Sequence, residues 1–132
     1  ESAYLMEQGI LEIHLARTRR KLTLDRFYKI ARKIQPDFDS RLQVYRELKS
    51  RQMIVKTGFK YGAHFRVYVG DPESEHSDYL VHGVPKNFEC SWEEISRAVR
   101  LAHGVRKHML FGRILDGKKG EIEYIIIERV KP

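Results

Sequence analysis

The sequence predicts an α+β fold, in which a helical, winged-helix-like part (residues 1–57) precedes a mixed β-sheet domain with one main helix (residues 58–132). In the first part, apolar residues recur at helical spacing. In the second part, short apolar runs are separated by turn-forming residues, as in strands. The 132 residues, 42% of them hydrophobic and 33% charged, are enough for one domain or two very small ones that share a core.

The chain is expected to open with the end of a short helix. Tyr4 and Leu5 would face inward, and Gly9 would close the helix, since glycine readily adopts the left-handed conformation found at helix ends. Residues 10–15 form a short apolar stretch, a candidate strand, that leads into a basic turn at residues 17–21.

Two longer helices and a strand follow. The first helix begins near Thr23 and ends before Pro36, because the residue before a proline is disfavoured in helical conformation. The second helix is expected over residues 38–50. An apolar alternation that ends at Phe59 then predicts a strand over residues 53–59. This helix–helix–strand order is the order of a winged-helix unit.

Four strands and one helix are expected in the second part. The helix begins at Ser91, because Ser91 and Glu94 have the spacing of a capping box. A glycine-containing turn at residues 116–120 joins the last two strands. The strands are expected at residues 65–69, 79–84, 110–115 and 122–130.

The helix that begins at Ser91 has an apolar face and a basic face. Its apolar residues recur at i, i+3, i+4 and i+7 and should pack on the sheet. At about 100° per residue, Arg97, Arg100 and Lys107 fall on the opposite side if helical turns continue as far as Lys107. The basic stripe is either an ordinary solvated face with favourable charges near the helix C-terminus, or part of a site for an anionic partner.

Charge and cysteine content bound the class of protein. The net charge of +7 and the pI of about 9.6 favour nucleic acid as a partner, although they would also keep a small domain soluble. Cys90 is the only cysteine, so no internal disulfide can form, and a reducing, cytoplasmic setting is expected. No apolar run approaches the roughly 18 residues of a membrane span, and no signal peptide is visible. Because the first residue is Glu1 rather than Met, the sequence is interpreted as a fragment, a processed chain or a chain without its leader.

Several stretches, read together in their order and spacing, resemble the archaeal tRNA-intron endonucleases. The resemblance is specific over about the last 80 residues. The first 57 residues resemble, less distinctively, the segment that precedes the catalytic domain in these enzymes. The stretches are residues 55–62 (VKTGFKYG), 65–68 (FRVY), 75–82 (EHSDYLVH), 95–107 (ISRAVRLAHGVRK) and 128–130 (ERV).

The resemblance implies an endoribonuclease that needs no metal or other cofactor. Its family cleaves precursor tRNA at bulge–helix–bulge intron junctions and leaves 2′,3′-cyclic phosphate and 5′-hydroxyl ends. The family's catalytic Tyr, His and Lys correspond to Tyr68, His76 and Lys107. Two arginines that hold an unstacked bulge base in the family correspond to Arg100 and Arg129.

The chemistry of these side chains fits cleavage without a metal. The reaction needs a base for the 2′-hydroxyl, an acid for the leaving 5′-oxygen and a cation for the phosphorane charge. His76 suits the acid, because an ordinary histidine has a pKa of about 6.5, and Lys107 suits the cation. Tyr68 as the base requires nearby cations, because an ordinary phenol has a pKa of about 10. Without the resemblance, all three would be interpreted as packing or surface residues.

Precursor tRNA and a second endonuclease subunit or repeat are the expected partners, because the implied substrate has two related cleavage sites. The apolar residues 122–130 either form the contact between subunits or are a central strand buried on both faces. Family members often carry several acidic residues in the loop before this strand, and that loop docks into another subunit. Here residues 116–121 include Lys118 and Lys119, so the type of assembly stays open.

Three other functions fit parts of the sequence. A winged-helix DNA-binding protein would use the helices of residues 23–50 and bind duplex DNA without cleaving it. A non-catalytic structural subunit of the endonuclease is disfavoured by the presence of Tyr68, His76 and Lys107 together. A metal-dependent nuclease is disfavoured because the sequence has no tight cluster of Asp and Glu.

Overall fold

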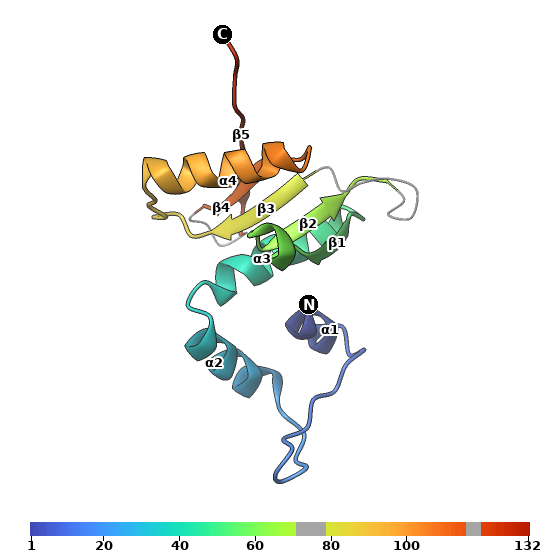
Figure 1. Ribbon diagram of the computed structural model, residues 1–132. Coiled ribbons are helices and arrows are strands. Elements are labelled where there is room, and N and C mark those ends of the chain that lie inside the picture. The colour runs from blue at the N-terminus through green and yellow to red at the C-terminus, as the bar shows by residue number, and fades with distance from the viewer. Residues whose placement is uncertain (71–78, 116–119) are drawn as a thin grey trace.

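The computed structural model describes residues 1–70, 79–115 and 120–132 (Figure 1). Over these residues the α+β fold is confirmed: helices come first, and a five-stranded mixed sheet with one main helix follows. In the same residues, no helix combines the length and the apolar character needed to cross a membrane.

The N-terminal part holds α1 (Ser2–Glu7), α2 (Leu24–Ile34) and α3 (Phe38–Ser50). Thr23 caps α2, because its hydroxyl oxygen accepts a hydrogen bond from the Arg26 amide at 3.4 Å. The inner sides of the helices meet around three buried residues, Ala3, Phe38 and Leu42.

The strands described by the structure form one sheet in the order β1-β2-β3-β4-β5. Neighbouring strands are antiparallel except β3 and β4, which are parallel because α4 (Trp92–Gly104) carries the chain back across the sheet between them. The strands are β1 (Ile54–Thr57), β2 (Phe65–Tyr68), β3 (Tyr79–Val84), β4 (His108–Ile114) and β5 (Ile122–Ile127).

A helix packs on each face of the sheet, α3 on one and α4 on the other (Figure 1). On the α4 face, Ala102 lies against Leu80 and Met109. Successive strand residues point to opposite faces, so Tyr68 faces the α4 side while its neighbour Val67 belongs to the core under α3. That core consists of Val44, Tyr45, Leu48, Val55, Val67 and Val81.

Several predicted boundaries are confirmed. Gly9 follows α1 in the left-handed region with a φ of 69°. Ser91 and Glu94 form a complete capping box, in which the Ser91 hydroxyl accepts from the Glu94 amide at 3.2 Å and the Glu94 carboxylate accepts from the Ser91 amide at 2.7 Å. The bounds of α3 and β3 are those predicted.

In the first part of the chain one strand prediction was wrong, and another was confirmed except for its end, since β1 covers Ile54–Thr57. Residues 10–15 make no strand, and a single β-bridge joins His14 to Lys21 instead. Phe59 lies in a 3₁₀ turn, η1 (Phe59–Tyr61), and is 88% exposed rather than part of β1. Gly58 precedes this turn, and only glycine fits there: any other residue would place its Cβ 2.8 Å from the Ala63 carbonyl oxygen, too close for a contact.

The last strand is shorter than predicted. β5 ends at Ile127, three residues before Val130, because Ile127 pairs with Met109 near the first residue of its partner strand. β5 is an edge strand and pairs with β4 alone in the described sheet, so the interpretation of this segment as a central strand was wrong.

Candidate functional site

The ends of three strands meet at one end of the sheet. β2 ends at Tyr68, and the register pairs Val67 with Tyr79, the first residue of β3. Tyr79 in turn pairs with His108, the first residue of β4. Tyr68 and Lys107 each lie one residue beyond this row, so the structure brings two of the three predicted catalytic residues to the same end of the sheet.

Tyr68 is a buried residue with a cation near its ring. It is 8% exposed, and Ile54 is its partner on β1. Lys56 Nζ lies 5.6 Å from the centroid of the Tyr68 ring. Lys56 is directly opposite Arg66 in the β1–β2 register, so two cationic residues flank Tyr68 on the same side of the sheet.

Lys107 is placed by the way α4 ends. The helix stops at Gly104, and Arg106 takes a φ of 57°, so helical turns do not continue as far as Lys107. The Lys107 amide donates to the Ala102 carbonyl at 2.9 Å, and the Arg106 amide donates to the His103 carbonyl at 3.1 Å. These two bonds are a Schellman motif, which turns the chain sharply from α4 into β4.

Tyr61 is a contact of Lys107 that the sequence did not predict. Lys107 Nζ lies 5.7 Å from the centroid of the Tyr61 ring, within the range of a cation–π interaction. Tyr61 ends η1 and packs against the cluster under α4, and Gly62 follows it with a φ of 65°. The signal for this contact was the run Phe-Lys-Tyr-Gly, which lies in one of the stretches that carry the family resemblance.

A groove of about 770 Å³ runs between α4 and the chain that follows β5. Arg100 lines it from α4, and Arg129 lines it from the C-terminal segment that passes α4 in Figure 1. Both side chains are exposed. The structure thus brings together the two arginines predicted to hold a base. The groove is also lined by Trp92, Glu93, Ile95, Ser96, Arg97, Val99, Ile127 and Glu128.

One ion pair links this groove to the end of the sheet that carries Lys107. The His108 ring nitrogen Nδ1 contacts the Glu128 carboxylate, whose residue lines the groove. His108 directly follows Lys107, and Glu128 directly precedes Arg129. The contact therefore fixes the start of the C-terminal segment beside β4.

His76, the third predicted catalytic residue, lies outside the described residues, as does most of the loop at residues 116–121. The roles predicted for His76 and for this loop therefore stay predictions. The two strand ends that flank the first gap, Tyr68 and Tyr79, both lie at the end of the sheet described above.

His64 and His82 form a separate pair, on the α4 side of the sheet. Their ring centroids are 4.8 Å apart, and His64 Nε2 lies 3.2 Å from Asp37 Oδ2. Burial, with a contribution from the nearby Arg41, lowers the pKa of His64 to about 4 and also lowers the pKa of His82. Both are therefore neutral at neutral pH, as buried histidines in a structural role would be. In the described part of the chain, no three His, Cys, Asp or Glu side chains form a cluster that could hold a metal.

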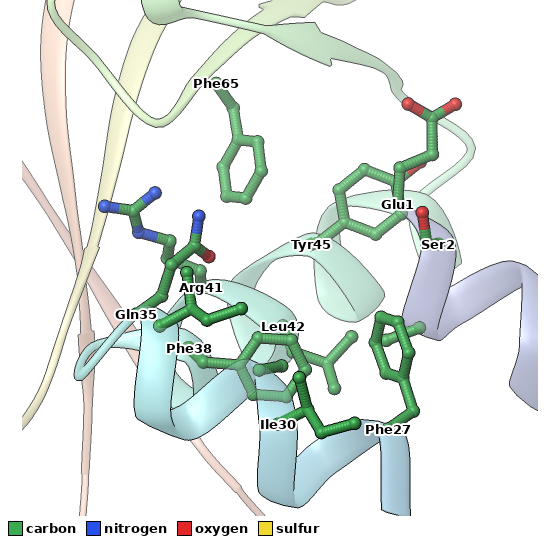
Figure 2. Close-up of a pocket in the computed structure, with 13 residues that line it drawn as sticks. Glu1, Ser2, Phe27, Ile30, Gln35, Phe38, Arg41, Leu42, Tyr45 and Phe65 are labelled. Carbon is green, nitrogen blue, oxygen red and sulfur yellow. The ribbon is translucent and has the colours of Figure 1, made fainter. Parts of the chain in front are cut away.

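An apolar hollow, separate from the groove beside α4, lies among the N-terminal helices. Its volume is about 340 Å³, and Figure 2 shows Phe27, Ile30 and Phe38 facing it from α2 and α3. Phe65 lines it from the start of β2, at the opposite end of that strand from Tyr68. It shares no lining residue with the groove beside α4.

Comparison with known proteins identifies the family. The family model described as "tRNA intron endonuclease, catalytic C-terminal domain" matches residues 38–124. A tRNA-splicing endonuclease of Thermococcus kodakarensis is 41% identical over 99% of this chain and 75% of its own length. Those of Methanococcoides burtonii and Thermoplasma volcanium are 42% and 56% identical, over 99% and 67% of this chain.

The share of each relative that is matched differs widely. The chain spans 37% of the length of the M. burtonii protein and 28% of that of T. volcanium. The family model begins at Phe38, the first residue of α3, and the division at residue 57 stays a prediction. The match over most of this chain and three quarters of the T. kodakarensis protein confirms the predicted family. This chain belongs to the tRNA-splicing endonucleases, a family of RNA-cleaving enzymes.

Proposed function

We propose that this chain is the catalytic part of an endonuclease that cleaves precursor tRNA at bulge–helix–bulge intron junctions. The observation that carries the proposal is the convergence of Tyr68 and Lys107 at one end of the sheet. His76 stands three residues before Tyr79 in the sequence, and three residues span at most about 11 Å. Covalent reach therefore supports a site that contains all three side chains.

In the proposed reaction, Tyr68 takes the proton of the 2′-hydroxyl, and the 2′-oxygen forms a bond to phosphorus. The bond from phosphorus to the 5′-oxygen breaks, and His76 gives that oxygen a proton. The Lys107 ammonium stabilises the negative charge of the phosphorane. The products are a 2′,3′-cyclic phosphate and a 5′-hydroxyl, and the atoms balance without water.

The surroundings of Tyr68 and Lys107 support these roles. The proposed base lies beside cationic side chains: Lys56 Nζ is 5.6 Å from the centroid of the Tyr68 ring, and Lys56 is paired with Arg66 in the strand register. Lys107 is half-buried, its backbone amide is bonded to the Ala102 carbonyl, and its Nζ lies 5.7 Å from the centroid of the Tyr61 ring, so its charge is placed before the substrate arrives.

Arg100 and Arg129 are proposed to hold an unpaired base of the RNA. The planar guanidinium groups of arginine stack on bases, and unpaired bases can be splayed out of the strand to meet them. Both arginines line one groove although 29 positions separate them in the sequence (129 minus 100). Neither takes part in an ion pair with a described residue, so both are available to a ligand.

Cleavage of a bulge–helix–bulge RNA should proceed at an undiminished rate in excess EDTA. The proposed acid, base and cation are all side chains, so chelation removes nothing from the reaction. The measurement is gel analysis of RNA that was annealed in monovalent salt, with mapping of the ends. RNA with 2′-deoxynucleotides at the two junctions is the control and should stay intact. Cutting that requires Mg²⁺ would contradict the mechanism, and no cutting in either condition would contradict the proposed function.

The chain is also proposed to act as an oligomer, or beside a second repeat, through β5. β5 is an edge strand, and Ile125 and Ile126 are 39% and 50% exposed. An edge strand with exposed apolar residues offers both unpaired backbone groups and hydrophobic surface to a partner. A second active unit would give one site for each of the two junctions.

Ile126→Glu should dissociate the oligomer, and so lower the mass measured in solution, because burying a charge in an apolar contact is costly. Cleavage should fall as the oligomer dissociates. Analytical ultracentrifugation and cleavage assays at matched concentrations provide the measurement. Ile10→Glu, after α1 and also 74% exposed, is the matched control and should change neither. A wild-type chain that is monomeric and fully active would refute the proposal.

A further inference from the structure

Trp92 is the one tryptophan of the sequence, and it is 78% exposed. It occupies the first position of α4 and lines the groove that holds Arg100 and Arg129. Within the described residues, no ring–ring or cation–ring contact involves its indole. Tryptophan is mostly buried in folded proteins, so an indole left open inside a groove marks a place where a partner covers it.

The residues around Trp92 match the chemistry of single-stranded RNA. Three arginines line the same groove, Arg97, Arg100 and Arg129, against two glutamates. One of those glutamates, Glu128, is already engaged by His108. Proteins that bind unpaired RNA combine aromatic rings, on which bases stack, with cations that hold the phosphates.

The spacing along α4 places Trp92 and Arg100 on one face of the helix, far enough apart to contact two different nucleotides. They are eight positions apart (100 minus 92), and at 1.5 Å per residue the two Cα atoms lie about 12 Å apart along the helix. Trp92, Ser96 and Arg100 follow an i, i+4, i+8 series, so they share one side of the helix. A stacked strand advances about 3.4 Å per nucleotide, so the groove is long enough for more than one nucleotide.

We propose that Trp92 stacks on an unpaired nucleobase of the RNA, next to the base held by Arg100 and Arg129. The groove then binds consecutive unpaired nucleotides, and Trp92 contributes to recognition of the bulge rather than to bond cleavage. This inference rests on the proposed function, because it takes the bulged RNA as the ligand.

A second copy of the chain is the competing occupant of the groove. The centres of protein–protein interfaces are depleted in charged residues, whereas Trp92 is surrounded by arginines and glutamates. The exposed apolar residues suited to such a contact, Ile125 and Ile126, do not line this groove. The composition of the groove therefore favours RNA.

Tryptophan fluorescence tests the proposal directly, because all tryptophan emission comes from Trp92. The wild-type chain is titrated with bulge–helix–bulge RNA that carries 2′-deoxynucleotides at both junctions, so that it binds without being cut. Its emission should be quenched as the RNA saturates it. A fully paired duplex of the same length should bind with little quenching. Equal quenching by the duplex, or no quenching at saturation, would overturn the proposal.

Substitutions supply the second readout. Trp92→Leu keeps an apolar side chain but loses the ring, and it should raise KM roughly fivefold or more with little change in kcat. Trp92→Phe restores a ring and should recover most of the loss, and Arg100→Ala should raise KM at least as much as Trp92→Leu. A wild-type KM in Trp92→Leu would refute the inference.

The two proposals fail in different ways. If the wild-type chain cuts the bulged RNA while Trp92→Leu keeps its KM, only the role of Trp92 is refuted. If the wild-type chain cuts no RNA, the proposed function fails, and the fluorescence titration still decides whether the indole stacks on a base. Two results together would assign the groove to a second copy of the chain and overturn the inference. The tryptophan emission would change with protein concentration before RNA is added, and Trp92→Leu would have a lower mass in solution than the wild-type chain.

Discussion

His76→Ala is expected to lower the rate of RNA cleavage by about 10²- to 10⁴-fold, the usual loss on removal of a general acid. Affinity for uncut RNA should hardly change, because the groove with Arg100 and Arg129 lies on other elements and stays intact. Single-turnover cleavage gives the rate, and filter binding to RNA with 2′-deoxynucleotides at the junctions gives the affinity.

A histidine outside the proposed site is the control for this experiment. His14 is exposed and contacts Glu12 and the Arg19 carbonyl in the N-terminal part, so His14→Ala should cleave at the wild-type rate. If His76→Ala loses binding and rate in equal measure, the residue positions the RNA and does not act as the acid. An unchanged rate would remove His76 from the site.

Lys107→Ala is expected to lower kcat by about 10²- to 10³-fold, the loss typical for removal of one preorganised group that stabilises transition-state charge. KM should change much less, because the charge of the phosphorane exists only in the transition state. Lys107→Arg should recover part of kcat, since a guanidinium keeps the charge but spreads it over a larger group. Steady-state kinetics on bulge–helix–bulge RNA separates kcat from KM.

Lys107→Ala should leave the backbone around residue 107 unchanged, so its effect on kcat reports the loss of the side chain. The bond from the Lys107 amide to the Ala102 carbonyl belongs to the backbone and survives the loss of the side chain. Lys33→Ala, on the exposed side of α2, removes one positive charge elsewhere and serves as the control. If both variants raise KM alike and leave kcat unchanged, Lys107 contributes only general attraction for RNA.

Local signals explain which elements the sequence predicted well. The caps at the helix starts depend only on residues within one helical turn, so the sequence alone predicts them. They are Thr23 at the start of α2 and Ser91 with Glu94 at the start of α4. The α3 helix has a buried side that repeats at helical spacing, and its predicted bounds are confirmed. Such features depend little on the rest of the molecule.

The features that were missed depend on tertiary contacts. Arg106 follows α4 in a left-handed conformation that non-glycine residues seldom adopt, so the sharp turn before Lys107 could not be predicted from the sequence. Phe59 fits a strand by its apolar character, but the strand ends before it, where the chain turns and Gly58 packs closely against Ala63. The contact of Tyr61 with Lys107 joins residues 46 positions apart (107 minus 61), and periodicity carries no information about such pairs.

The site itself was predicted more from resemblance than from physical chemistry. Side-chain chemistry alone makes a histidine and a lysine reasonable, but it does not select Tyr68 among seven tyrosines. The strand register adds what the sequence lacked, since it places Tyr68 and Lys107 at one end of the sheet. The groove likewise joins Arg100 to Arg129, which the pattern of charges along α4 could not do.

The exposed edge of the sheet has a consequence for the chain wherever no partner covers it. β5 reads Ile-Glu-Tyr-Ile-Ile-Ile, a short run of strong strand formers of the kind that joins into fibrils when left uncovered. Glu128, Arg129 and Lys131 follow it at once, and charges flanking such a run oppose stacking of identical strands. We expect Arg129 to have two uses for its charge: it would oppose stacking of β5 strands while the sheet edge is uncovered, and in the folded chain it lines the groove.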